Sequence, residues 1–317
     1  MPAVLAVDLG KTGCRAGLWT GDDAEPRSGR EVPGTPGLAG PGGAAEAGAV
    51  VLAVARQLLD AAGVRRLDAV CVGAAGALAA PEAARALAEA LLAGLPAEEA
   101  GVTSDAVTAH AGALGGAVGV VLAAGTGAVA VGVGADGDCA VVDGWGPWLG
   151  DDGSGAWIGT AGLRAALRAH DGRGAPTALQ RAAADAFGAL PRLPTVLGEG
   201  GNPARRAASF APAVARAAAE GDGAALGIMR AAAAALGEAV TAAARRSRVP
   251  DPVPVAVTGG LVNLGDSLLT PLRAVLAAAG GPALRLQPAL GDPLSGARLL
   301  ALRAEGPHQP LVTRLRR

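Results

Sequence analysis

A strand that runs into a glycine-flanked hydroxyl turn occurs twice in this chain, and the repetition constrains the fold more than any other feature. The first copy is Val4-Leu-Ala-Val-Asp-Leu-Gly-Lys-Thr-Gly13, and the second is Val118-Gly-Val-Val-Leu-Ala-Ala-Gly-Thr-Gly127. Turns of this kind expose backbone N–H groups that can bind phosphate oxygens. Two of them predict a chain of two similar halves that hold one polyphosphate from opposite sides.

The apolar periodicity extends this repetition through both halves. The strands predicted in the first half are 4–7, 14–19, 30–32, 68–73 and 102–104, and the helices are 45–62, 81–92 and 106–114. Pro81 suits the first turn of a helix, where its missing N–H costs nothing. The second half repeats the three strands over 118–124, 128–133 and 139–142. These patterns predict an α/β protein.

A helical region of about 154–247 interrupts the second half before the sheet resumes. The remaining predicted elements are a strand at 253–257, a helix at 268–279, a strand at 284–286 and a helix at 294–303. A length of 317 residues is more than one hydrophobic core usually serves. We therefore expect an N-terminal domain at 1–107 and a C-terminal domain at 108–317, with the last helix packing back on the first domain and a cleft between the two.

Charge and hydropathy narrow the set of partners. A formal net charge of −1 removes the simplest argument for binding nucleic acid or an anionic membrane. The stretch 111–135 has no charged residue and is long enough to span a bilayer, but its eight glycines argue against one continuous helix. Two short buried strands explain it better. Because no leader pattern starts the chain, we expect a cytoplasmic protein without a membrane partner.

Neither the cysteines nor the histidines form a metal-binding or disulfide pattern. The cysteines are Cys14, Cys71 and Cys139, and the histidines are His110, His170 and His308. The cysteines lie far apart without a Cys-x-x-Cys motif, which suggests neither a disulfide framework nor a zinc site and fits a reducing compartment. Each histidine is expected to be a surface or locally bonded residue. The basic end of the chain, 314–317, is expected to be a frayed terminus.

The two turns provide candidate phosphate ligands. Gly10, Lys11 and Thr12 offer backbone amides, a cation and a hydroxyl, and Gly125 and Thr126 repeat the pattern in the second half. Asp8 directly precedes the first turn and could hold a hydrated Mg²⁺. A strand ending in Asp-x-Gly is also an ordinary hairpin turn, but recurrence at matching places makes coincidence the weaker explanation.

Two further segments have both a structural and a functional interpretation. Asp105 either caps the helix that follows it or orients a substrate hydroxyl as a base. The loop 144–155 also has two interpretations. In the structural one, Asp151, Asp152 and Ser154 cap the next helix and the tryptophan rings pack beneath it. In the functional one, the five glycines of the loop allow the backbone to approach a ligand closely. Gly259, Gly260 and Asn263 follow a strand, where an adenosine could lie, or simply form a strand-to-helix turn.

Taken together, these residues resemble the N-acetylglucosamine kinase branch of the BadF/BadG/BcrA/BcrD ATPase family. The shared motifs are Asp8–Thr12, 103–105, 125–127, Gly144-Trp-Gly146, Gly150-Asp-Asp-Gly-Ser154, 259–260 and 295–297. The resemblance implies two ribonuclease H-like domains of the actin, Hsp70 and sugar-kinase type with an interdomain cleft. It implies ATP and Mg²⁺ as cofactors, N-acetylglucosamine as the acceptor for 6-phosphorylation, and a homodimer.

The resemblance also assigns roles to individual residues. Asp105 matches the catalytic base, and Thr12 and Thr126 match phosphate contacts. The residues expected to hold the sugar are Asp105, Gly127, Gly144, Trp145, Gly146 and Asp151. The sequence departs from the family at 33–37, where an Asn is usual, and at Ala74 or Ala75, where a Ser is usual.

These departures keep other functions open. Loss of polar contacts could favour another sugar, such as glucosamine or N-acetylmuramic acid, or leave an ATPase or sugar sensor without kinase turnover. Iron–sulfur ATPases of the same family need two cysteines per subunit, and Cys139 has no second cysteine after it. That branch is therefore disfavoured.

Overall fold

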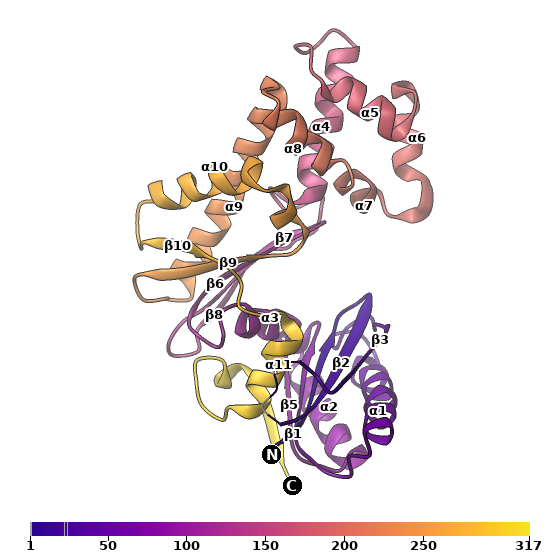
Figure 1. Ribbon diagram of the computed structural model, residues 1–317, viewed down its shortest axis with the longest axis vertical. Coiled ribbons are helices and arrows are strands. Elements are labelled where there is room, and N and C mark those ends of the chain that lie inside the picture. Colours follow the sequence, from indigo (N-terminus) through magenta and orange to yellow (C-terminus); the bar gives the residue numbers. More distant parts are fainter. Residues whose placement is uncertain (1, 22, 24) are drawn as a thin grey trace. The chain divides into compact units, whose positions relative to one another are not determined.

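The computed structural model describes residues 2–21, 23 and 25–317, which divide into two compact units (Figure 1). The first unit comprises Met1–Val118, Val133–Cys139 and Pro288–Arg317, and the second comprises Gly119–Gly132 and Ala140–Gln287. The C-terminal helix therefore belongs to the same unit as the first strands. Each unit is built on its own mixed sheet.

The sheet of the first unit has six strands in the order β11-β5-β4-β1-β2-β3. Their bounds are β1 (Ala3–Leu9), β2 (Gly13–Thr20), β3 (Ser28–Pro33), β4 (Leu67–Ala74), β5 (Ala97–Thr103) and β11 (Thr313–Arg316). Strands β1 to β3 are antiparallel, and β4 and β5 run parallel to β1. The helices are α1 (Gly43–Ala62), α2 (Pro81–Gly94), α3 (Asp105–Ala113) and α11 (Pro293–Leu302).

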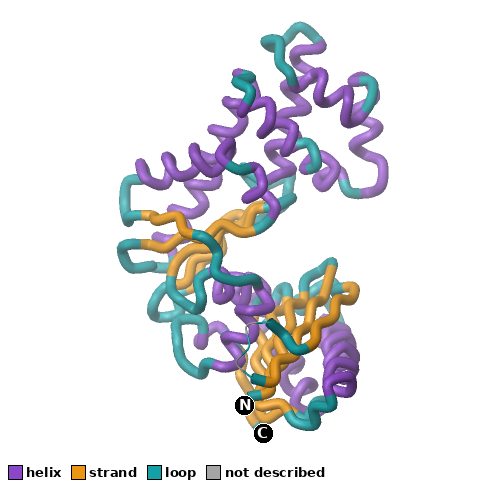
Figure 2. Tube along the Cα trace, in the orientation of Figure 1, coloured by secondary structure: helices purple, strands orange, loops and turns teal. Residues whose placement is uncertain are grey.

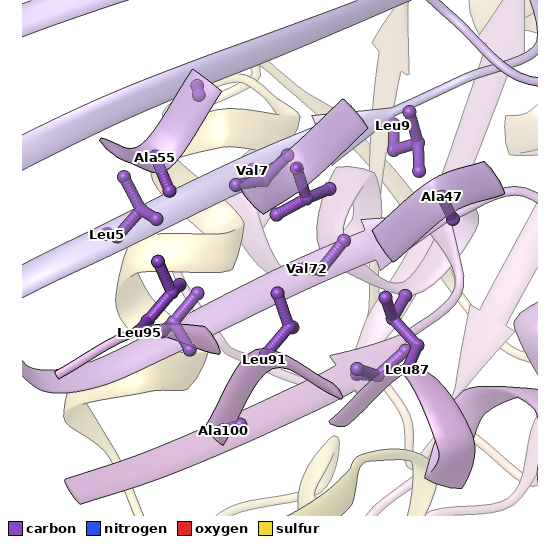
Figure 3. Close-up of a cluster of buried hydrophobic side chains, with 14 of the residues drawn as sticks. Leu5, Val7, Leu9, Ala47, Ala55, Val72, Leu87, Leu91, Leu95 and Ala100 are labelled. Atoms are coloured by element: carbon purple, nitrogen blue, oxygen red, sulfur yellow. The ribbon is translucent and has the colours of Figure 1, made fainter. Parts of the chain in front are cut away.

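Helices cover both faces of this sheet. Leu5, Val7 and Leu9 of β1 pack in the cluster that includes α1 and α2 (Figure 3). Val4 and Ala6, which alternate with them, belong to the opposite cluster with α3 and α11. Because successive strand side chains point to opposite faces, a strand covered on both sides is apolar throughout. This explains the continuous apolar run that begins the chain.

The second unit repeats the arrangement with five strands in the order β10-β9-β6-β7-β8. Their bounds are β6 (Gly119–Ala124), β7 (Ala128–Val133), β8 (Cys139–Asp143), β9 (Val253–Thr258) and β10 (Leu284–Gln287). This order corresponds to β5-β4-β1-β2-β3 of the first unit, and β9 runs parallel to both β6 and β10. The predicted repeat is confirmed, as is the pair of strands in the uncharged stretch.

Seven α-helices accompany this second sheet in the described chain (Figure 2). They are α4 (Gly155–His170), α5 (Leu179–Phe187), α6 (Leu193–Gly198), α7 (Pro203–Ala208), α8 (Ala211–Ala219), α9 (Gly223–Arg246) and α10 (Asp266–Ala278). By length and hydropathy alone, α9 could cross a membrane. Nine of its residues are buried within the protein, and core helices meet the same criterion.

The end of the chain is ordered, so the expectation of a frayed terminus is wrong. β11 pairs antiparallel with β5, and Arg314 and Arg316 both form ion pairs with Glu99 of that strand. The basic residues that looked like a loose tail are therefore the partners of one largely buried carboxylate. Sequence periodicity could not show this, because the two segments are more than 200 residues apart.

Candidate functional site

The first of the two hydroxyl turns predicted to bind phosphate, residues 10–13, connects β1 to β2 and is closed by a 2.9 Å hydrogen bond from Gly10 N to Gly13 O. Lys11 and Thr12 are exposed at its tip. Gly34 lies against the turn so closely that a Cβ there would overlap the carbonyl oxygen of Gly10, and the amide of Thr35 donates to the same oxygen at 3.3 Å. The segment after β3 therefore supports the backbone of the turn.

Asp8, predicted as the Mg²⁺ residue, lies in a chain of charges with Arg15 and Asp292. Arg15 donates from Nη2 to Asp8 Oδ2 at 2.9 Å and from Nη1 to Asp292 Oδ2 at 3.0 Å. Burial raises the pKa of Asp8, and Arg15 opposes this shift. Sequence reasoning missed Arg15, although the β1–β2 register, which places it opposite Asp8, could have indicated it.

The surroundings of Asp8 fit a hydrated cation better than a protein-caged one. Asp8 Oδ1 accepts no hydrogen bond within the part of the chain that the structure describes. In the same part no group of three His, Cys, Asp or Glu side chains could hold a metal ion. A Mg²⁺ ion with one carboxylate would take its other ligands from water and phosphate oxygens, as this ion usually does.

Asp105 is the first residue of α3, and Ser104 separates it from the end of β5. Ser104 is the N-cap of this helix, since its hydroxyl accepts from Ala106 N at 3.0 Å, and Asp105 Oδ1 accepts from the same amide at 2.9 Å. Burial raises the pKa of Asp105, the Ala106 amide lowers it, and the charge of Asp8 raises it again. A partly buried carboxylate with a raised pKa is a suitable proton acceptor.

The helix that carries Asp105 is tied to the C-terminal part of the same unit. In Figure 1, α11 lies beside α3. A Cβ on Gly112 would overlap the carbonyl oxygen of Asp292, so the two backbones touch. At the far end of α3, His110 Nδ1 lies 2.8 Å from His308 Nε2, and both rings are buried. The expectation that these histidines are surface or locally bonded residues is wrong, because the pairing depends on the tertiary fold.

The second phosphate turn is held by the helix that follows it. Gly125 N donates to Gly127 O at 2.8 Å, and the amides of Gly155 and Ala156 donate to the carbonyl oxygens of Gly125 and Thr126 at 2.8 and 3.0 Å. Thr126 itself is exposed. The turn is thereby fixed with its hydroxyl free to meet a ligand.

The proposed adenosine segment lies at the end of β9, in the same unit as this turn. Gly259 has a φ of +87°, and a Cβ there would lie 2.5 Å from the carbonyl oxygen of Ala124. Gly260 begins a short 3₁₀ helix that contains the exposed Asn263. The backbone of this segment therefore lies against the end of β6, immediately before the phosphate turn.

The glycine-rich loop 144–153 is organised by Asp143, a residue that sequence reasoning missed. Its two carboxylate oxygens accept from Asp151 N at 2.7 Å and from Asp152 N at 2.9 Å. Asp143 has a φ of +64°, and Asp151 has a φ of +56°. A Cβ on Gly127 would lie 2.8 Å from Asp151 Oδ2, so the absence of a side chain lets the Asp151 carboxylate lie against the phosphate turn.

The tryptophans of this loop do not pack beneath the following helix. Trp145 is 74% exposed and Trp148 is 91% exposed, which contradicts the structural interpretation of the loop for these two rings. Ser154 does cap α4, accepting from Trp157 N at 3.2 Å. Gly144 and Gly146 both have positive φ, a conformation that glycine adopts without steric cost.

The two departures from the family pattern are neighbours in space. The amide of Leu38 donates to Ala75 O at 2.8 Å, and a Cβ on Gly37 would lie 3.2 Å from the same oxygen. The loop 33–37 and the end of β4 therefore form one region of the first unit. A change of side chain at either position therefore affects the same local environment.

Two units whose mixed sheets share a five-strand order, each with a glycine-flanked hydroxyl turn after its first strand, define the actin-like ATPase fold. The chain matches the BadF/BadG/BcrA/BcrD ATPase family over residues 5–292 and belongs to it. Membership of an ATPase family implies that the chain binds ATP.

Solved structures show the same fold. A Chromobacterium violaceum protein provisionally identified as an N-acetylglucosamine kinase is 29% identical, with a TM-score of 0.68 over 96% of this chain and 99% of that one. A Porphyromonas gingivalis protein with the same provisional identification is 20% identical, with a TM-score of 0.64 over 94% and 98%. A ROK family glucokinase from Streptomyces griseus, solved with glucose and AMPPNP, is 19% identical, with a TM-score of 0.53 over 95% and 99%. No curated protein matches the chain.

Proposed function

We propose that the chain is an ATP-dependent kinase that phosphorylates the 6-hydroxyl of an amino sugar, with N-acetylglucosamine as the first candidate acceptor. The observation that carries this proposal is Asp105, a partly buried carboxylate at the end of β5 whose pKa is raised by burial. Membership of the ATPase family and the 29% identity to a provisionally identified N-acetylglucosamine kinase support it.

In this proposal Asp105 accepts the proton of the sugar hydroxyl while that oxygen attacks the γ-phosphorus of ATP. The bond from the γ-phosphorus to the bridging oxygen breaks, and ADP leaves. The amide of Gly10, the ammonium of Lys11 and the hydroxyl of Thr12 bind phosphate oxygens and stabilise their charge. A Mg²⁺ ion held through water by Asp8 would neutralise further phosphate charge when bound.

Residues of the second unit are also proposed as ligand contacts. Gly125 and Thr126 are proposed to bind phosphate, and Gly259, Gly260 and Asn263 to contact the adenosine. Gly127, Gly144, Trp145, Gly146 and Asp151 are proposed to hold the sugar. The use of ATP as the donor favours the cytoplasm as the place of reaction.

The first experiment measures ADP release from the purified protein with Mg·ATP and a panel of amino and N-acetylamino sugars. Asp105→Asn should lose most sugar-dependent turnover and still bind ATP, because the amide cannot accept the proton. Asp136→Asn, an exposed turn position, is the matched control. If Asp105→Asn retained its turnover, Asp105 would not be the catalytic base.

A sugar sensor without turnover is the second candidate, favoured by the altered region around 33–37 and Ala75. ATP and sugar binding without ADP release for any sugar in the panel would support it. Turnover with one sugar, lost in Asp105→Asn, would exclude it.

A further inference from the structure

A large pocket lies within the second unit, beside the glycine-rich loop. Its volume is about 880 Å³, and Trp148 and Asp151 of the loop line one part of it. One face of α4 forms a wall, with α7 and the start of α9 completing the enclosure. Pockets that enclose drug-sized ligands measure about 300–1,000 Å³. The space therefore exceeds what one pyranose ring fills.

The residues of α4 that line the pocket change from aromatic to polar along the helix. Trp157 and the Trp148 ring offer aromatic surface near Asp151. Thr160, Arg164 and Arg168 follow at intervals of four residues, so they lie on one face of the helix. Aromatic surface suits the apolar face of a sugar ring, and the hydroxyl and the two guanidinium groups suit a polar extension of it.

The positive charge along this wall exceeds the negative charge. Asp151 is the one carboxylate among the described lining residues, against two arginines. Arg168 donates to Arg173 O at 3.1 Å, whereas the Arg164 guanidinium has no hydrogen bond or ion pair with any residue that the structure describes. A guanidinium without a protein partner in a pocket can bind a carboxylate through two parallel hydrogen bonds.

We infer that this pocket binds an acidic substituent of the acceptor, so that the preferred substrate is an amino sugar carrying a carboxylate group. The inference rests on the proposed function, since it takes Asp151 as a contact of the sugar ring. The ring would lie at the loop, and the substituent would extend along α4 to Arg164. Such a ligand would also cover the Trp148 ring, which is otherwise exposed.

The test compares three ligands that differ in one group. They are N-acetylglucosamine, N-acetylmuramic acid, which adds a lactyl carboxylate, and the methyl ester of N-acetylmuramic acid, which has nearly the same shape without the charge. Dissociation constants are measured by calorimetry and by tryptophan fluorescence, because Trp148 and Trp157 line the pocket. The acid should bind about tenfold or more tightly than its ester, as expected for a hydrogen bond to a charged group.

Arg164→Gln should reduce this preference for the acid over its ester to about twofold or less. Arg181→Gln is the matched control, since Arg181 is an exposed arginine of α5 outside the pocket. Arg164 is itself exposed, so its replacement is not expected to affect folding. Equal binding of acid and ester by the unaltered protein, or a preference that survives Arg164→Gln, would overturn the inference.

Turnover, measured separately, distinguishes this inference from the proposed function. If the protein phosphorylates N-acetylglucosamine but shows no Arg164-dependent preference for the acid, the kinase proposal stands and the inference about the pocket is refuted. Arg164-dependent binding of the acid without phosphorylation of any sugar would keep the pocket and refute the kinase.

Discussion

Replacement of Asp143 by Asn tests whether the glycine-rich loop is held by a single carboxylate. The carboxylate accepts two backbone hydrogen bonds, at 2.7 Å from Asp151 N and 2.9 Å from Asp152 N. Asn has one acceptor oxygen, so its NH₂ group would face an N–H donor. Because Asn tolerates the left-handed conformation of Asp143 about as well as Asp does, the backbone itself is not strained.

The expected magnitude follows from the lost hydrogen bond. A hydrogen bond to a charged group contributes about 1.5–3 kcal/mol, which corresponds to roughly a 10- to 150-fold change in an equilibrium. If Asp151 must be held in place to bind the sugar, kcat/KM for the sugar should fall by about this factor. The affinity of the free protein for ATP should change less, since the amides of Gly155 and Ala156 still hold the second hydroxyl turn.

The assay is the coupled measurement of ADP release, with sugar binding followed by tryptophan fluorescence if turnover is absent. Asp152→Asn is the control from the same loop, because the exposed Asp152 side chain accepts no hydrogen bond within the described chain. Unchanged sugar kinetics in Asp143→Asn, or an equal loss for ATP and for sugar, would refute the reasoning.

Three further predictions concern the first unit. Gly34→Ala places a Cβ against the carbonyl oxygen of Gly10, so the affinity for ATP should fall while the fold persists. Calorimetry measures the affinity and circular dichroism follows the fold. An unchanged affinity would contradict the prediction. Burial and the nearby His110 lower the pKa of His308 to about 3, compared with about 6.5 in an unfolded chain. The free energy of unfolding should therefore decrease as the pH falls below 6.5. Between pH 7 and 5 the free energy of unfolding, measured with urea, should decrease by about 2 kcal/mol, and this decrease should be absent in His308→Gln. An equal decrease in both proteins would argue against the prediction. Glu99→Gln removes the shared partner of two arginines and should lower Tm and expose β11 to proteolysis, whereas an unchanged cleavage rate would show that the strand is held by other contacts.

The sequence by itself determined the elements and their repetition. Alternating and helical apolar patterns predicted the strands of both sheets and helices such as α2, where Pro81 does occupy the first turn. These signals are local, because strand and helix periodicity is read from adjacent residues. The hydroxyl turns and the Ser154 cap were readable for the same reason.

The tertiary structure alone decided which distant residues meet. Arg15 with Asp292 and His110 with His308 are pairs that no local pattern contains. Glu99 likewise acquires its arginine partners only when β11 joins the edge of the sheet. Burial raises the pKa of Asp105, and the packing around its helix α3 brings together strand β1 and helix α11 from opposite ends of the chain. Local propensity selects the elements, but long-range packing sets the distances and the dielectric environment on which chemistry depends.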